Sequence, residues 1–271
     1  MSILNKEDYE EPRCLLNMDR SEERPLYSVP IGRIVEKLDE YLSRDDWDGA
    51  GRHLLYWLAE AQAGGDRRGE LSLRNELMGH YRKTGREKEA RESMREALRL
   101  LDGLGMTENI IAGTTWVNAA TVCKTFGHAD EAMPYFEKAL PLYERELPDN
   151  DWRLGGLYNN MALALADLGR YDEAEAYYQK ALSTMGKIPG SELEQAVTWM
   201  NLADLTHLRD EEADVTGMLE KAEALLQTES LPRDGYYAYV CVTCAPGFDY
   251  YGWFMTAKEL REAAEKIYAG T

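Results

Sequence analysis

Three copies of one pattern decide the fold: Tyr81-Arg-Lys-Thr-Gly85-Arg-Glu-Lys-Glu-Ala90, Cys123-Lys-Thr-Phe-Gly127-His-Ala-Asp-Glu-Ala132 and Leu165-Ala-Asp-Leu-Gly169-Arg-Tyr-Asp-Glu-Ala174. The glycines at 85, 127 and 169 are 42 residues apart, and an alanine follows each of them by five positions. A fixed period of this length is typical of an array in which similar units stack along one axis.

Each copy predicts two amphipathic helices around a turn. After each alanine, a large and then a small residue recur at helical spacing, as Met94/Ala97, Phe136/Ala139 and Tyr178/Ala181. The glycine supplies the backbone freedom that ends the first helix, and acidic residues after the turn favour the start of the second. Pro134 lies inside one such second helix and is expected to kink it or delay its start.

Weaker copies extend the pattern on both sides. Asp46-Trp-Asp-Gly-Ala50 places an alanine 40 residues before Ala90, and Trp199-Met-Asn-Leu-Ala203 with Leu219 and Ala222 continues the period downstream, with Asp210 in place of the turn glycine. A last helical pair is predicted at about 235–246 and 249–268, around Pro246-Gly247, with the aromatic residues of 250–254 packed inward and a polar capping helix at the end.

The 271 residues therefore form a single all-α array and not two globular domains. We expect an N-terminal arm over 1–30, partly extended, followed over 31–268 by about five repeats and a C-terminal capping pair. The fold class is an α-solenoid of stacked antiparallel helix pairs.

The pattern resembles the tetratricopeptide repeat, whose usual unit has about 34 residues with large, small and glycine residues at fixed positions. The spacing of 42, with Gly169-Arg-Tyr-Asp-Glu-Ala-Glu-Ala-Tyr-Tyr-Gln-Lys-Ala-Leu182, is similar to the longer-helix subclass found in kinesin light chains. The resemblance implies a right-handed superhelix in which first helices line a concave groove and second helices form the convex side.

Function then depends on the side chains that the first helices project into the groove. The candidate groove residues are Asn75, Arg82, Lys83, Asn118, Thr121, Lys124, Asn159, Asn160, Asp167, Asn201, Asp204 and His207.

An asparagine recurs at one repeat position, as Asn118, Asn160 and Asn201. A ladder of amides could bind the backbone of an extended peptide without reading its side chains. Alternatively, each amide could bond to a neighbouring helix or to its own preceding carbonyl and hold the repeats in register. The sequence leaves both interpretations open.

The charge of −18 argues against partners that are held by a positive field, so neither nucleic acid nor a membrane surface is expected. Residues 67–99 are an exception, with ten basic and six acidic side chains, which leaves −22 for the rest. Arg82 and Lys83 are expected to face the groove and attract an acidic segment. Most of the others are expected on the solvated convex face, in pairs such as Glu87–Arg91.

No sequence motif for catalysis, a cofactor or a metal is found. Cys241 and Cys244 form a single CxxC with no second CxxC and no nearby histidine, so we interpret them as buried thiols. The N-terminus turns charged before a signal-peptide core can form, and the longest apolar stretch, 236–255, is interrupted by proline, glycine and aspartate. These features predict a cytoplasmic protein with free cysteines.

The sequence thus predicts a non-catalytic scaffold that binds a peptide or protein segment in its groove. One alternative is a peptide-sensing regulatory protein. Another is an enzyme or accessory subunit with a pocket around Asp167, Asp204 and His207, which a buried histidine–carboxylate pair would favour. A homo-oligomer formed through the aromatic C-terminal pair is also possible.

Overall fold

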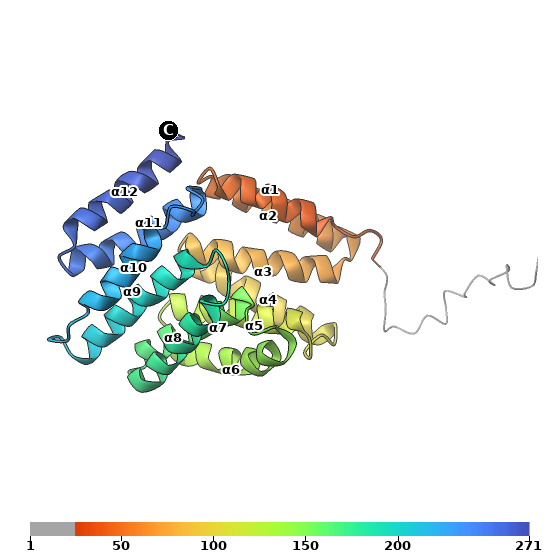
Figure 1. Ribbon diagram of the computed structural model, residues 1–271. Coiled ribbons are helices and arrows are strands. Elements are labelled where there is room, and N and C mark those ends of the chain that lie inside the picture. The colour runs from red at the N-terminus through yellow and green to blue at the C-terminus, as the bar shows by residue number, and fades with distance from the viewer. Residues whose placement is uncertain (1–24, 271) are drawn as a thin grey trace, which may run out of the picture.

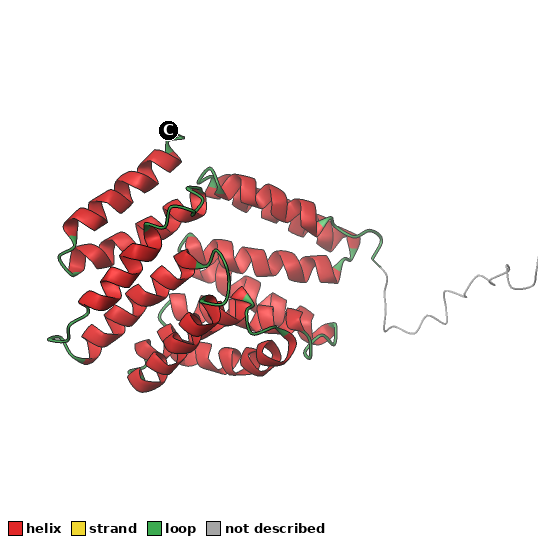
Figure 2. Ribbon diagram, in the orientation of Figure 1, coloured by secondary structure: helices red, strands yellow, loops and turns green. Residues whose placement is uncertain are grey.

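A computed structural model describes residues 25–270, which form α-helices joined by short loops, with no strand among them (Figures 1 and 2). The helices are α1 (Ile31–Leu42), α2 (Trp47–Gly64), α3 (Arg67–Lys83), α4 (Glu87–Gly103), α5 (Ile110–Thr125), α6 (Ala129–Glu146), α7 (Trp152–Asp167), α8 (Tyr171–Met185), α9 (Glu192–Arg209), α10 (Thr216–Leu226), α11 (Gly235–Tyr250) and α12 (Phe254–Tyr268). The all-α solenoid predicted from the sequence is confirmed.

Most of the predicted N-terminal arm, residues 1–24, lies outside the described residues. Residues 25–30 form a loop that is bonded to the turn between α2 and α3. The amide of Leu26 donates to the Gly64 carbonyl at 2.8 Å, and the amide of Val29 donates to the Asp66 carboxylate at 2.9 Å. This loop therefore covers the start of the array.

Consecutive helices pack as pairs, from α1 with α2 to α11 with α12. First helices of neighbouring pairs also contact one another, as α3 does with α5 and α9 with α11. Each second helix from α2 to α8 packs against the first helix of the next pair. The first helices therefore form one layer, whose solvent side we call the inner face, and the second helices form the outer layer.

The repeated glycines and alanines explain this packing. Gly85, Gly127 and Gly169 have φ values of 70°, 84° and 71°, which is the left-handed region that glycine adopts without steric cost. The alanines that follow them, Ala132 and Ala174 among them, are 0% exposed. A methyl group at these positions lets the two helices of a pair approach closely.

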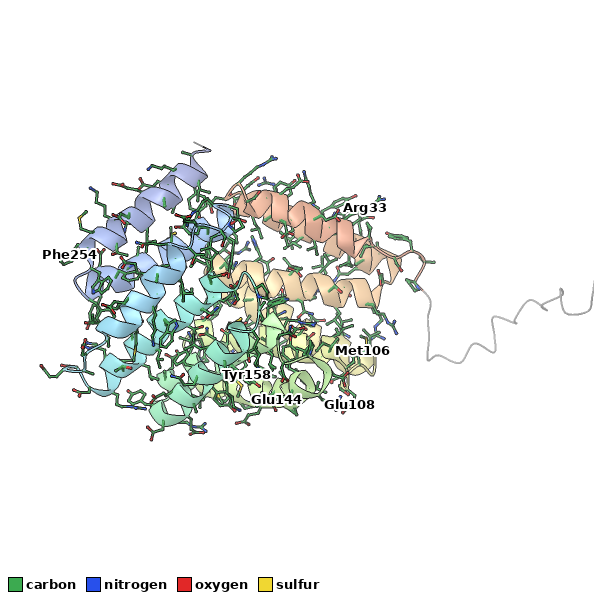
Figure 3. All side chains as sticks on the ribbon, in the orientation of Figure 1. Arg33, Met106, Glu108, Glu144, Tyr158 and Phe254 are labelled. Carbon is green, nitrogen blue, oxygen red and sulfur yellow. The ribbon has the colours of Figure 1, made fainter. Side chains whose placement is uncertain are left out.

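Two details of the last pair differ from the sequence prediction. Pro246 lies inside α11, and the turn comes at Gly252, where φ is 81°. The proline removes a hydrogen bond to the carbonyl of Val242, but this residue is 50% exposed, so water can replace the lost donor. The predicted inward packing is only partly correct, because Tyr250 and Phe254 are 68% and 67% exposed and Phe254 lies at the edge of the molecule (Figure 3).

The delayed helix start predicted as one effect of Pro134 is absent, and the alternative, a kink, stays a prediction. The helix that contains Pro134 begins at Ala129, immediately after the turn, so its start is not delayed, and a second proline, Pro141, lies further along it.

The array curves until its last pair reaches its first, as Figure 1 shows at the end of α1 and the start of α11. A Cβ added to Gly235 in α11 would lie 3.5 Å from the Cα of Ser43, which follows α1. The ammonium of Lys83 in α3 lies 4.8 Å from the centre of the Tyr239 ring in α11. The two ends of the described array are thus in direct contact.

Candidate binding groove

The candidate residues fall into columns on the inner face. Counted back from the turn positions 85, 127, 169 and 210, they lie two or three, six, and nine or ten residues before the turn. Because an α-helix has 3.6 residues per turn, these positions share one side of each first helix. The first column contains Arg82, Lys83, Lys124, Asp167 and His207, the second contains Thr121 and Asp204, and the third contains Asn75, Asn118, Asn159, Asn160 and Asn201.

The asparagines of the third column are hydrogen-bonded within the protein. The side-chain amide of Asn118 donates to the Asn75 carbonyl oxygen at 2.9 Å, and that of Asn201 donates to Asn159 at 3.2 Å. Each bond joins position nine of one first helix to position ten of the preceding one. The amides therefore connect neighbouring helix pairs.

This ladder is interrupted between α5 and α7. Position ten of α5 is Val117, which offers no side-chain acceptor, and the Asn160 amide donates instead to the Gly156 carbonyl of its own helix at 2.9 Å. Hydrogen bonds of this kind are expected if the asparagines hold the repeats in register. Binding of a ligand by the same amides stays a prediction.

Three cations lie close together on the inner face. Arg82 and Lys124 are half-buried and form no ion pair within residues 25–270, and Lys83 lies over the rings of Trp47 and Tyr239 at 5.7 and 4.8 Å. Burial lowers the pKa of Lys124, and the nearby Arg82 lowers it further while Asp167 raises it. The mutual influence of these groups shows that α3, α5 and α7 bring them into one region.

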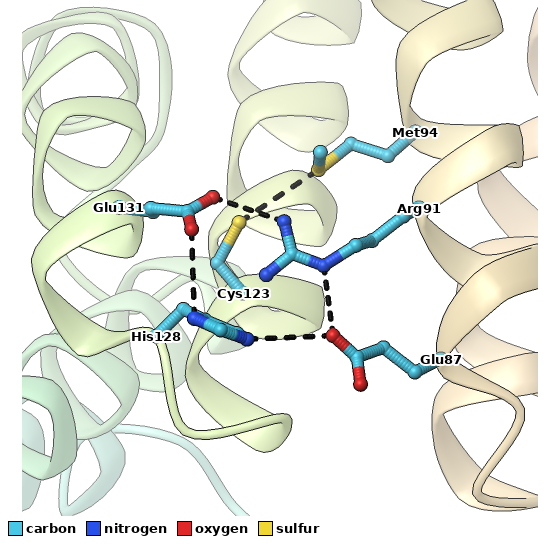
Figure 4. A network of polar contacts seen from close by, with 6 residues as sticks. All are labelled: Glu87, Arg91, Met94, Cys123, His128 and Glu131. Carbon is cyan, nitrogen blue, oxygen red and sulfur yellow. Dashed lines mark hydrogen bonds and ion pairs between the residues drawn. The ribbon is translucent and has the colours of Figure 1, made fainter.

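The rest of the basic segment 67–99 is used differently. Arg91 of α4 bonds to Glu87 and to Glu131 of α6, both at 3.0 Å, and His128 lies 3.4 and 3.5 Å from the same two carboxylates (Figure 4). This confirms the predicted Glu87–Arg91 pair. Because these groups are partly exposed on the outer layer, each pair contributes at most about 1 kcal/mol.

Asp204 and His207 occupy the part of the inner face beside the last pair. Asp204 accepts a hydrogen bond from the Tyr251 hydroxyl at 2.9 Å, and His207 bonds to the Tyr250 hydroxyl at 2.8 Å. Burial raises the pKa of Asp204, and the Tyr251 bond opposes this rise. Each group bonds to a tyrosine and no bond joins the two, so Asp204 and His207 do not form the histidine–carboxylate pair that would favour the enzyme hypothesis.

Sequence reasoning missed two inner-face residues. Glu76 occupies position nine of α3, where later repeats have asparagine, and burial and Asp39 raise the pKa of its carboxyl group. Applying the asparagine position to the repeat that contains Gly85 would have identified Glu76. Tyr239 was not predictable, because it approaches α3 only through the curvature of the whole array.

The tetratricopeptide repeat family model matches residues 69–145 and 153–228, which is more than half of the chain. The chain therefore belongs to the tetratricopeptide repeat family, whose members are generally non-catalytic scaffolds for protein–protein interaction. No curated protein matches the chain at a significant level.

Solved structures share the fold at low sequence identity. A putative kinesin light chain with nearly identical TPR-like repeats from Podosopora anserina is 16% identical, with a TM-score of 0.52, and the match covers 73% of this chain and 94% of that one. BtubC (BKLC) from P. vanneervenii is 19% identical, with a TM-score of 0.50 and coverage of 90% and 92%. A Rap protein complexed with Competence and Sporulation Factor is 14% identical, with a TM-score of 0.57 and coverage of 86% and 62%.

Two further properties concern residues 25–270. None of their helices combines the length and the apolar character needed to cross a membrane. Burial raises the pKa of the Cys123 thiol to about 11 and that of Cys244 to about 12, so both are protonated near neutral pH and unreactive.

Proposed function

We propose that the protein binds an acidic peptide or protein segment along its inner face, without catalysis. The observation that carries this proposal is the cation pair Arg82 and Lys124, which is half-buried and forms no ion pair within the described residues, while Asp167 acts on Lys124 without bonding to it. Charges in such surroundings are weakly screened, so an incoming carboxylate would gain more there than on the outer layer.

The asparagine columns support an extended ligand. The amide oxygens of Asn118 and Asn201 are acceptors for backbone N–H groups, while their nitrogens are engaged with neighbouring helices. A segment that follows the inner face could thus be held by its backbone at α5 and α9 and by its carboxylates near α3. We also propose a cytoplasmic location, which the free cysteines Cys123, Cys241 and Cys244 support.

A peptide-sensing regulator is a second candidate. The Rap protein that shares this fold was solved in complex with a factor, Competence and Sporulation Factor. In the present chain, contact between the first and last pairs gives such a regulator two ends whose separation a ligand could change.

The test is a titration with two fluorescein-labelled probe peptides, one of alternating glutamate and alanine and one of alternating lysine and alanine. We expect the acidic probe alone to bind, and Arg82→Gln combined with Lys124→Gln to weaken it about 10-fold, roughly 1.4 kcal/mol. Lys88→Gln combined with Arg95→Gln is the matched control, because these exposed cations of α4 remove the same charge from the outer layer. Equal weakening by both double variants, or no binding of the acidic probe, would contradict the proposal.

A further inference from the structure

A half-open pocket lies where the two ends of the array meet. It has a volume of about 420 Å³, within the usual range for small-ligand sites. We call it the end pocket, and its lining residues are Asp39, Leu42, Ser43, Asp45, Trp47, Lys83, Asp234, Gly235, Tyr236, Tyr239 and Tyr268. Its walls come from α1, α2 and α3 on one side and from α11 and α12 on the other.

The lining combines aromatic rings with carboxylates. Trp47 comes from the first pair, and Tyr236, Tyr239 and Tyr268 come from the last, with the rings of Tyr236 and Tyr239 stacked at 6.3 Å. Aromatic faces attract ammonium and guanidinium groups, and they do so at partly exposed sites such as this one, where the three tyrosines are 41–48% exposed. The pocket therefore has the walls of a site for organic cations.

An ammonium group already occupies one side of this pocket. Lys83 lies 5.7 Å from the centre of the Trp47 ring and 4.8 Å from that of Tyr239, one ring from each end of the array. This geometry shows that an ammonium fits between the two walls.

Lys83 does not neutralise the pocket. Three carboxylates line it, so the net charge with Lys83 is −2. Asp45 accepts a hydrogen bond from the Trp47 indole at 2.6 Å, and Asp234 accepts from the amides of Tyr236 and Tyr237 at 3.0 Å. Within the described chain neither aspartate has a cationic partner in an ion pair.

We propose that the end pocket binds an organic cation, namely an alkylammonium or guanidinium group. The source is either a free polyamine or a lysine or arginine side chain of a partner, since both present the same group to the same walls. A bound cation would bridge Trp47 and Asp45 of the first pair to Asp234 and Tyr239 of the last and so hold the ends together. This proposal is independent of the one for the inner face, because Arg82 and Lys124 do not line the end pocket and the ligand has the opposite charge; Lys83 lies beside both sites.

The key variant combines Asp45→Asn with Asp234→Asn. Asparagine accepts the same hydrogen bonds, caps a helix as well as aspartate does, and tolerates the left-handed conformation of Asp45, where φ is 57°. The variant thus removes two charges and keeps the fold. The matched control combines Asp102→Asn with Asp149→Asn, two exposed carboxylates outside the pocket.

The experiment is isothermal titration calorimetry at low ionic strength with two probes, spermidine and the lysine analogue Nα-acetyl-lysine-methylamide. We expect saturable one-to-one binding of at least one probe, weakened about 10-fold by the pocket variant and less than about twofold by the control. Binding of spermidine alone assigns the site to free polyamines, and binding of the lysine analogue assigns it to a side chain.

Two further variants keep the test decisive. Tyr239→Leu removes an aromatic wall and is expected to weaken binding several-fold, whereas Lys83→Met removes the resident cation and is expected to strengthen it. The proposal is overturned if neither probe binds saturably, if pocket and control variants weaken binding equally, or if Tyr239→Leu has no effect.

Discussion

The same repeat gives different helix pairs in the middle and at the end of the array. The middle pairs are α5–α6 and α7–α8, and the last two are α9–α10 and α11–α12. They differ in helix length and in the residue at the turn. The second helices α6 and α8 have 18 and 15 residues, whereas α10 has 11. In the middle pairs the turn residue is a left-handed glycine, whereas Asp210 at the end of α9 is extended, with φ of −150°.

The shorter helix has a consequence for the core. The apolar core divides within α9, so that Leu202 and Leu205 belong with the preceding helices while Leu193 and Ala203 belong with the last ones. A half-open pocket of about 420 Å³ lies among α10, α11 and α12, beside Leu226, Leu260 and Ala263, among other residues. In the α9–α10 pair, the loss of the turn glycine and of helix length thus coincides with the division of the core.

The largest expected effect comes from the same substitution made in both regions. Ala132→Leu in α6 adds volume at a site with 0% exposure and should lower the free energy of unfolding by about 2–3 kcal/mol. Ala263→Leu in α12 places the same added volume beside the open pocket. The free energy of unfolding should then change by less than about 0.5 kcal/mol or rise. Urea unfolding of both variants measures the difference, and equal costs would show that the two cores are packed alike.

A smaller effect is expected at the turn glycine that the α9–α10 pair replaces with Asp210. Gly169→Ala should lower the free energy of unfolding by about 1–2 kcal/mol, because φ is 71° there. An added Cβ has no atom within 4 Å, so the cost comes from the backbone conformation alone. Gly169→Asn is the control, since asparagine tolerates this conformation and should recover part of the loss. A thermal melt in which both variants match the wild type would contradict this account.

The smallest effect concerns acid. Burial lowers the pKa of His80 in α3, so the unfolded chain binds a proton more readily than the folded one. The contribution of His80 to the stability of the fold is therefore fully present above about pH 6.5 and is lost as the pH falls below it. Burial raises the pKa of Asp204 in α9, so its folded carboxyl keeps a proton more readily and this group favours the folded state as the pH falls.

Hydrogen exchange at pH 7.5 and 5.5, corrected for the intrinsic exchange rate, should thus show a greater loss of protection in α3 than in α9. His80→Gln, which cannot be charged, should remove most of this difference. An unchanged difference in that variant would exclude His80 as its cause.

Much of the fold could be predicted from the sequence because the repeat is encoded locally. Gly127 and Ala132 each act within one helix pair, so their spacing alone predicts that pair. The prediction at Pro246 was wrong because a proline usually ends a helix, yet α11 continues through it at a place where Val242 is exposed. That outcome depends on solvent access and not on spacing.

The site was less predictable because it depends on relations between pairs. The asparagine column could be found, but the partner of Asn160 depends on whether the preceding helix offers an acceptor at position ten, and Val117 does not. The position of Lys83 beside Tyr239 depends on small rotations between pairs that accumulate over the array. No local sequence pattern encodes this accumulated rotation.

The contact between Ser43 and Gly235 also limits how such a protein can change in length. In an open solenoid, duplication or loss of one repeat preserves the contacts of all the others. Here an additional unit of 42 residues would carry α11 past α1, separate Trp47 from Tyr239, and expose the faces that now meet. Insertion or loss of a whole repeat would therefore remove the contact between the two ends, a loss that an open solenoid does not face.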